Sequence, residues 1–156
     1  MASHDVKTVL EAEGVEYELL PHAHTESALA EAKALGLDPA DVAKTLVVET
    51  PDGYARAVLP ASERLDLRKL GDLLGAGKKK VQLASEEALA RDYPEFDLGA
   101  VPPLGGSRRD PVVIDRRVAE RESVVLEAGS HDESVRIARD DLVRLTGAQV
   151  ADISRD

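Results

Sequence analysis

One lysine and one glycine- and proline-rich segment carry the residue types in this sequence that are best suited to chemistry. Lys44 directly precedes the apolar run TLVV, so a strand that begins there would hold the ammonium group at its entrance. The segment Gly99 to Pro103 combines a glycine, which permits close backbone approach, with prolines that fix the chain direction. Such a loop could present free N–H groups rigidly to a developing oxyanion. An ordinary strand-edge lysine and an ordinary loop stay open as alternatives.

Histidines form a second group of candidates. His22 and His24 stand two residues apart and could offer two metal ligands, with His131 or Asp132 as the third. A single HxH pair is a weak signal for a metal site. The carboxylates also show no metal-ligand spacing, so we expect no metal and no cofactor. Ser130 and Asp132 flank His131 and supply the residue types of a hydrolytic triad. Adjacent side chains diverge, however, and cannot form the hydrogen-bond relay that a triad needs.

The stretch GAGKKK, residues 75–80, resembles part of a phosphate-binding loop. The motif GxxxxGK[ST] would require glycine in place of Asp72 and serine or threonine in place of Lys79, so it is absent. We expect a flexible loop with a solvated basic cluster, and a local contact with a phosphate backbone is the alternative.

Composition limits the class of protein. The 156 residues are 43% hydrophobic and 32% charged, which predicts one folded domain over 1–156 with an aliphatic core. The formal charge of −10 argues against a protein that coats nucleic acid. There is no cysteine, which excludes a thiol nucleophile and a thiolate metal site. With no apolar run of membrane-spanning length and no signal sequence, we expect a cytoplasmic protein without membrane contact.

The candidate residues need elements to position them, and periodicity predicts these elements. Helices are expected over 4–13, 28–35, 65–75, 85–93 and 140–145, with a helical turn at Pro39. Strands are expected over 15–19, 43–50, 54–60, 80–83, 111–115, 123–129, 134–138 and 148–153. Hairpins alternate with helical connections in this order, which predicts an α/β fold with a mixed, largely antiparallel, barrel-like sheet and flanking helices.

Several segments, in order, resemble the YbaK family, the free-standing relatives of the editing domain of bacterial prolyl-tRNA synthetase. The matching segments are His22 with Thr25 and Glu26, VAKTLVV around Lys44, KKVQLAS, GAVPPLG, and VVLEAGSHDESVRI followed by DLVRLTGA. The resemblance covers the chain from about Val15 to Asp152.

The resemblance implies a YbaK-like fold and a trans-editing deacylase that hydrolyses the ester of a mis-attached cysteine, alanine or serine on tRNA, with proline tRNA expected. It implies that Lys44 meets the terminal adenosine or its phosphate, while loop backbone groups hold the aminoacyl carbonyl. The other residues that it places around the substrate are Thr45, His22, Thr25, Gly99, Ala100, Val101, Pro102, Pro103, Gly129, Ser130 and His131. The partner is the acceptor end of aminoacyl-tRNA, with a synthetase as a further candidate partner. Lys78 to Lys80, Arg108 and Arg109 are candidates for further phosphate contacts.

Two other hypotheses stay open at this point. A non-catalytic module could keep the same pocket for a nucleotide or for a synthetase. A metal-dependent hydrolase could use His22, His24 and His131.

Overall fold

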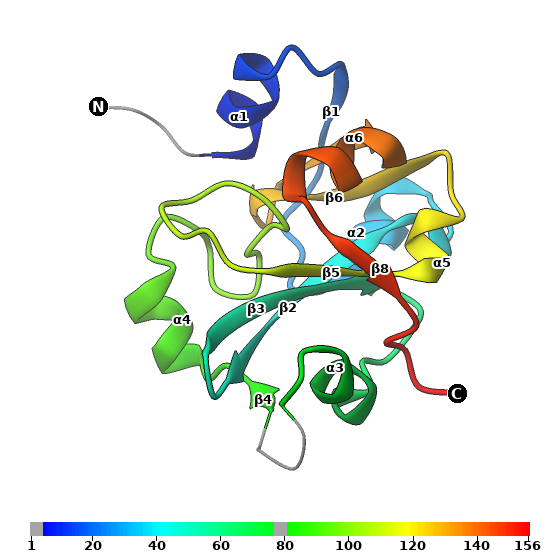
Figure 1. The fold of residues 1–156 in the computed structure, drawn as a ribbon. Helices are drawn as coiled ribbons and strands as arrows, with labels where there is room; N and C mark the ends of the chain where they lie inside the picture. The colour runs from blue at the N-terminus through cyan, green and yellow to red at the C-terminus, as the bar shows by residue number, and fades with distance from the viewer. Residues whose placement is uncertain (1–4, 77–80) are drawn as a thin grey trace.

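The computed structural model describes residues 5–76 and 81–156. The helices are α1 (Val6–Ala12), α2 (Ala28–Leu35), the short 3-10 helix η1 (Pro39–Asp41), α3 (Leu67–Leu73), α4 (Glu86–Asp92), α5 (Arg116–Ala119) and α6 (Arg139–Thr146). The strands are β1 (Tyr17–Pro21), β2 (Ala43–Thr50), β3 (Gly53–Pro60), β4 (Gln82–Leu83), β5 (Val112–Asp115), β6 (Ser123–Ser130), β7 (Glu133–Ala138) and β8 (Gln149–Ala151). Figure 1 shows their arrangement.

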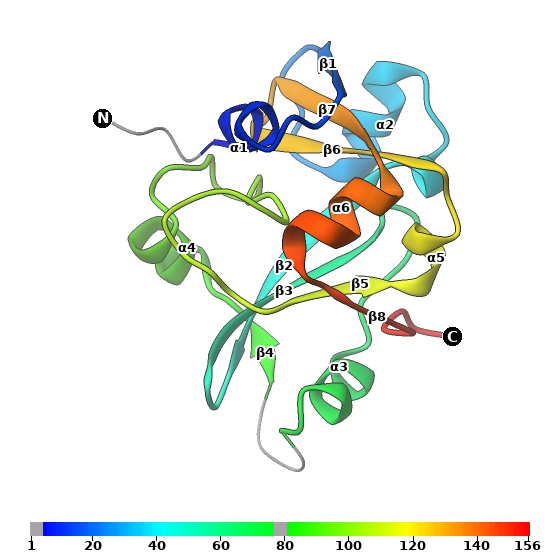
Figure 2. The same ribbon diagram turned by 45° about the horizontal axis from the view of Figure 1, so that its top comes forward.

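The strands form two sheets, which Figures 1 and 2 show from two directions. One has the order β1-β7-β6 and is antiparallel, and the other has the order β4-β2-β3-β5-β8. In the second sheet β2 pairs antiparallel with β3 and β4, whereas β5 pairs parallel with β3 and β8. The predicted α/β class with mixed, largely antiparallel pairing is confirmed.

The prediction of one barrel-like sheet is corrected. Within the described residues, the two sheets are joined by a single parallel bridge between Val42 and Val125. β4 occupies the far half of this edge of β2, at Val48 and Glu49, so only the start of β2 is left for β6. The sheets therefore separate just after the bridge instead of closing into a barrel.

Local sequence signals account for most elements. Ser27 caps α2 by accepting a hydrogen bond from the Ala30 N–H, and Gly36 ends the helix in the left-handed conformation, as predicted. One strand end and one short helix differ from expectation. β1 extends through Pro21, which an edge strand tolerates because its outer N–H positions need no partner. The one-turn helix α5, capped by Asp115, was not predicted because it is too short to show periodicity.

The core lies on both faces of the five-stranded sheet. Between the two sheets, apolar side chains of β3, β5, β6 and β7 pack with α1 and α6. On the opposite face, β2, β3 and β5 pack against α3, which Figure 1 shows beneath the sheet. The part of the chain that the structure describes contains no helix long and apolar enough to cross a membrane.

Candidate active site

A cavity of about 190 Å³ opens where β2 and β6 separate beyond their bridge. Its walls come from the start of β2, the start of α2, the loop after α4, and one residue of β6. The lining residues are Glu26, Ser27, Ala28, Ala43, Lys44, Thr45, Leu46, Gly99, Ala100, Val101, Pro102 and Glu127. The structure thus brings Lys44 and Thr45 together with most of the predicted loop.

Lys44 lies at the second position of β2, opposite Leu59 of β3, so its backbone is fixed by the hairpin. Its side chain is partly buried, and burial, followed by repulsion from Arg64, lowers the pKa of its ammonium group. Among the described residues, no hydrogen bond or ion pair engages Nζ. A cation so placed forms no ion pair with the described part of the protein, although the Glu63 carboxylate is near enough to raise its pKa, and it can pair with an anionic ligand group.

The loop presents backbone donors to the same cavity. Gly99 has φ +82°, a conformation that favours glycine, and the Ala100 N–H donates to the Asp97 carbonyl at 2.9 Å. In the described part of the chain, the N–H groups of Gly99 and Val101 make no hydrogen bond. They are available to stabilise negative charge on a substrate oxygen.

The AGSH turn, residues 128–131, is hydrogen-bonded to the start of this loop. The Asp97 N–H donates to the Gly129 carbonyl at 2.9 Å, and the His131 N–H donates to Asp97 Oδ2 at 3.1 Å. His131 Nε2 lies 2.5 Å from the Leu98 carbonyl oxygen, directly before Gly99. The side chain of His131 is only 6% exposed. The structure therefore places Gly129 and His131 behind the loop and not among the residues that line the cavity.

Three more predicted residues lie away from the cavity wall. Thr25 donates its N–H to the His131 carbonyl oxygen at 2.9 Å, and Pro103 lines a different cavity. Ser130 Oγ donates to Asp132 Oδ1 at 2.7 Å, whereas the His131 ring is engaged at Leu98. The three neighbouring side chains form no triad relay, in agreement with the sequence argument.

His22 and His24 also bond within the protein. His22 Nε2 lies 2.9 Å from Ser134 Oγ, and His24 Nε2 lies 2.6 Å from Glu26 Oε1. Within residues 5–76 and 81–156, no group of three or more His, Cys, Asp or Glu side chains could hold a metal ion. The described residues therefore offer no site for the metal-dependent alternative.

Sequence reasoning missed Glu127, which reaches the cavity from β6. Its side chain is 12% exposed, and Oε2 is buried 3.2 Å from His131 Nδ1 without forming a hydrogen bond. Burial, with the nearby carboxylates of Glu31, Asp97 and Glu26, raises its pKa to about 8. The available signal was an acidic residue inside the otherwise apolar run VVLEAG.

Arg56 of β3 was missed as well. Its side chain is 2% exposed, with Nε 3.2 Å from Asp110 Oδ2. Its guanidinium donates to the carbonyl oxygens of Pro102 at 2.9 Å and Gly105 at 3.2 Å. One buried arginine thus fixes the loop segment that continues from the cavity wall.

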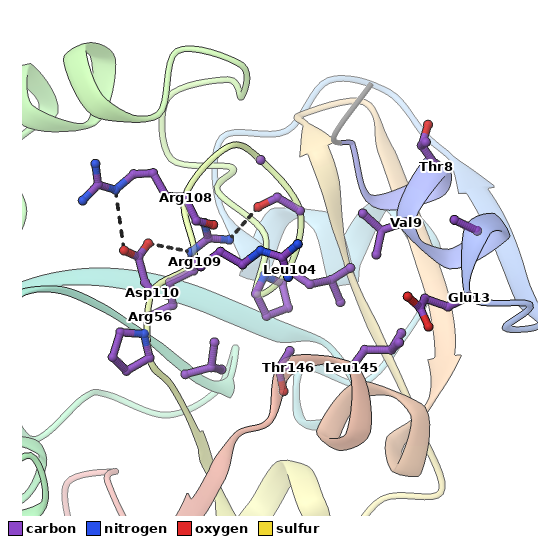
Figure 3. Close-up of a pocket in the computed structure, with 16 residues that line it drawn as sticks. Thr8, Val9, Glu13, Arg56, Leu104, Arg108, Arg109, Asp110, Leu145 and Thr146 are labelled. Carbon is purple, nitrogen blue, oxygen red and sulfur yellow. Dashed lines mark hydrogen bonds and ion pairs between the residues drawn. The ribbon is translucent and has the colours of Figure 1, made fainter. Parts of the chain in front are cut away.

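A wider cavity, of about 570 Å³, lies between α1, α6 and the segment 103–112 (Figure 3). It shares no lining residue with the Lys44 cavity. Arg108 and Arg109 line it, and Arg108 also lies 3.5 Å from Asp110 and 4.9 Å from the Tyr54 ring centroid. Their predicted phosphate contacts are therefore not at the Lys44 cavity, and Lys78 to Lys80 lie outside the described residues.

An unpaired ammonium group and free backbone donors around a small cavity can orient an activated ester and stabilise an oxyanion. The model of the aminoacyl-tRNA editing domain matches residues 22–145. The chain belongs to this family, which confirms the resemblance found in the sequence.

Known proteins agree with this assignment. A protein of Enterococcus faecalis (strain ATCC 700802 / V583), named as the Cys-tRNA(Pro)/Cys-tRNA(Cys) deacylase EbsC, is 28% identical over 140 residues, which are 89% of this chain and 84% of that protein. A crystal structure described as a trans-editing enzyme for prolyl tRNA synthetase has a TM-score of 0.84 and 29% identity, covering 97% of this chain and 95% of that one. A crystal structure of a hypothetical protein has a TM-score of 0.87 and 28% identity, covering 96% and 99%. The chain is accordingly a trans-editing aminoacyl-tRNA deacylase, an ester hydrolase.

Proposed function

We propose that this deacylase removes a small mis-attached amino acid from proline tRNA, with cysteine as the principal group and alanine and serine as the others. The observation that carries this is the cavity of about 190 Å³ that joins Lys44 to the free N–H groups of Gly99 and Val101. Its volume is below the about 300–1,000 Å³ of sites for drug-sized ligands. The cavity therefore suits the aminoacyl group and its ester, with the adenosine at the opening. The similarity to a Cys-tRNA(Pro)/Cys-tRNA(Cys) deacylase supports cysteine and proline tRNA.

Lys44 is the proposed catalytic residue, and it acts by holding the end of the tRNA. Its ammonium group, partly buried and outside any ion pair among the described residues, binds the terminal phosphate or adenosine. The Gly99 and Val101 N–H groups then stabilise the oxyanion that forms when the ester carbonyl is attacked. The nucleophile is water or the substrate's own side chain. An aminoacyl ester is already activated, so orientation and backbone donors supply the catalysis.

The other predicted residues support this pocket in two ways. Thr45 and Gly99 to Pro102 line it, whereas His22, Thr25, Pro103, Gly129, Ser130 and His131 hold the surrounding turns in place. Selectivity follows from size, since one methylene is worth only about 1–3 kcal/mol in an apolar pocket and larger groups must be excluded by steric clash. We propose that residues 1–156 act as one editing domain in the cytoplasm, where a synthetase is a further partner.

A panel of charged tRNAs tests this function. Proline tRNA charged with cysteine, alanine, serine or proline is incubated with the protein, and release of each amino acid is followed. We expect release of the small groups and retention of proline. Rates equal to buffer for every small group would refute the deacylase. If the protein released no amino acid but recovered a synthetase in a pull-down, the non-catalytic binding module would become the favoured function.

A further inference from the structure

Glu127 is the second charged group of the Lys44 cavity without a conventional partner. It projects from β6 at the point where the β6–β7 register becomes irregular, between Glu127 and Ser130. Its Oε2 atom is buried and accepts no hydrogen bond, although His131 Nδ1 lies 3.2 Å away. A buried carboxyl oxygen without a hydrogen bond destabilises the fold unless a ligand supplies a donor.

The charges around Glu127 make a positive ligand group more favourable. Glu31 is fully buried nearby, with its Oε1 also lacking a hydrogen-bond partner, and Asp97 and Glu26 add further negative charge. His131 faces Glu127 from the AGSH turn and already bonds the Leu98 carbonyl through its other ring nitrogen. The wall of the cavity at β6 is therefore acidic.

Lys44 lies on a different wall of the same cavity, and the two groups do not compensate each other. The charged neighbours that shift the pKa of Lys44 are Arg64 and Glu63, and those that shift the pKa of Glu127 are carboxylates. The cavity thus offers one ammonium group outside any ion pair and one carboxyl group that burial and its acidic neighbours keep largely protonated near pH 7, which a cationic ligand group would ionise. The complementary ligand carries an anionic group and a cationic group with a short spacer between them.

An aminoacyl ester at the end of a tRNA has this pattern, because a phosphate lies on one side of the ester and the α-ammonium group on the other. We propose that Glu127 is a specificity residue that binds the substrate's α-ammonium group, so that the site accepts aminoacyl esters with a free amino group and rejects N-acylated esters. This inference rests on the proposed function. It adds discrimination against acylaminoacyl- and peptidyl-tRNA, whose α-nitrogen is an amide and carries no charge.

The test compares each small aminoacyl-tRNA that the wild type cleaves with its N-acetyl form, using wild type and Glu127→Gln. We expect wild type to prefer the free amine by about 10-fold or more in kcat/KM. Glu127→Gln should lower kcat/KM for the free amine by about 10- to 100-fold and leave the N-acetyl ester within about twofold, since a hydrogen bond between charged groups is lost. Glu18→Gln removes an exposed carboxylate that pairs with Arg136 and is the control, with no expected change.

Each outcome decides one of the two proposals. No hydrolysis of any small aminoacyl-tRNA by wild type refutes the proposed function. Equal hydrolysis of free and N-acetyl esters by active wild type refutes only the role of Glu127, whether or not the variant folds. An equal loss on both esters in Glu127→Gln also overturns it, because that result indicates that Glu127 takes a proton from the nucleophile or has a role in folding. Retention of the preference for the free amine in a folded variant overturns it as well.

Discussion

The Lys44 cavity and the wider cavity beside Arg56 are lined by consecutive stretches of one loop, yet they treat charge in opposite ways. In the wider cavity, Arg56 and Arg108 both lie in ion-pair range of Asp110 (Figure 3), and Arg56 also donates to three loop carbonyls, although Arg108 Nε makes no hydrogen bond among the described residues. In the smaller cavity, Lys44 has no partner among the described residues, and Glu127 Oε2 accepts no hydrogen bond. The cavity that we propose as the site is therefore the smaller one, distinguished by an ammonium group outside any ion pair and not by its volume.

The largest expected effect is the loss of stability when Arg56 is removed. Arg56→Met removes the donor to three loop carbonyls and the buried arginine that pairs with Asp110, so we expect a loss of about 3–5 kcal/mol in the free energy of unfolding. Urea unfolding at pH 7 measures this. A loss below about 1 kcal/mol would show that the wider cavity is not a structural support for the loop.

A smaller effect is expected at the turn behind the loop. In Gly129→Ala the new Cβ would lie 2.8 Å from Phe96 Cδ1 at φ +105°, which predicts a loss of about 1–3 kcal/mol. Gly147→Ala is the matched control, because its φ is +62° and nothing lies within 4 Å of the new Cβ. Thermal unfolding should show a larger loss for Gly129→Ala, and equal losses would contradict the close packing of Phe96 behind the loop.

The pH dependence of stability sharpens the contrast for Glu127. Its pKa is raised from 4.5 to about 8 in the fold, so folding takes up a proton between these values. Stability contributed by this group therefore falls as pH rises through that window and changes no further above it. Urea unfolding from pH 4 to 9 should show the stability of wild type falling relative to Glu127→Gln. Parallel curves would mean that Glu127 is not desolvated.

The smallest effect is expected at Arg109, which lines the wider cavity and is exposed. Arg109→Met should change deacylation by less than about twofold and unfolding by less than about 0.5 kcal/mol. Single-turnover kinetics on charged proline tRNA measures the first value. A tenfold loss of deacylation activity would indicate that the tRNA phosphates bind at the wider cavity, which would contradict the contrast between the two cavities.

Sequence periodicity and caps predicted most of the fold, because these signals are local. Ser27 and Gly36 bound α2, and the hairpin that carries Lys44 follows from its apolar runs. The separation of the two sheets was not predictable, since it depends on which edge of β2 is left free by β4.

The site was predicted in part. Lys44 and Gly99 to Pro102 do share a cavity, as the ordered motifs indicated. Glu127 and Arg56 were missed because each reaches the loop from a strand distant in sequence, and spacing along the chain carries no information on such contacts. Both had a visible sign, a charged residue within an apolar strand. Such residues need a buried partner or a ligand.

The most direct test of the account compares Lys44→Met with wild type in release of cysteine from charged proline tRNA. The substitution keeps an unbranched side chain, shorter by the terminal nitrogen, and removes the ammonium group, so unfolding should be unaltered while kcat/KM falls by at least about 100-fold. A folded Lys44→Met that retains wild-type deacylation would contradict the assignment of the reaction to this cavity.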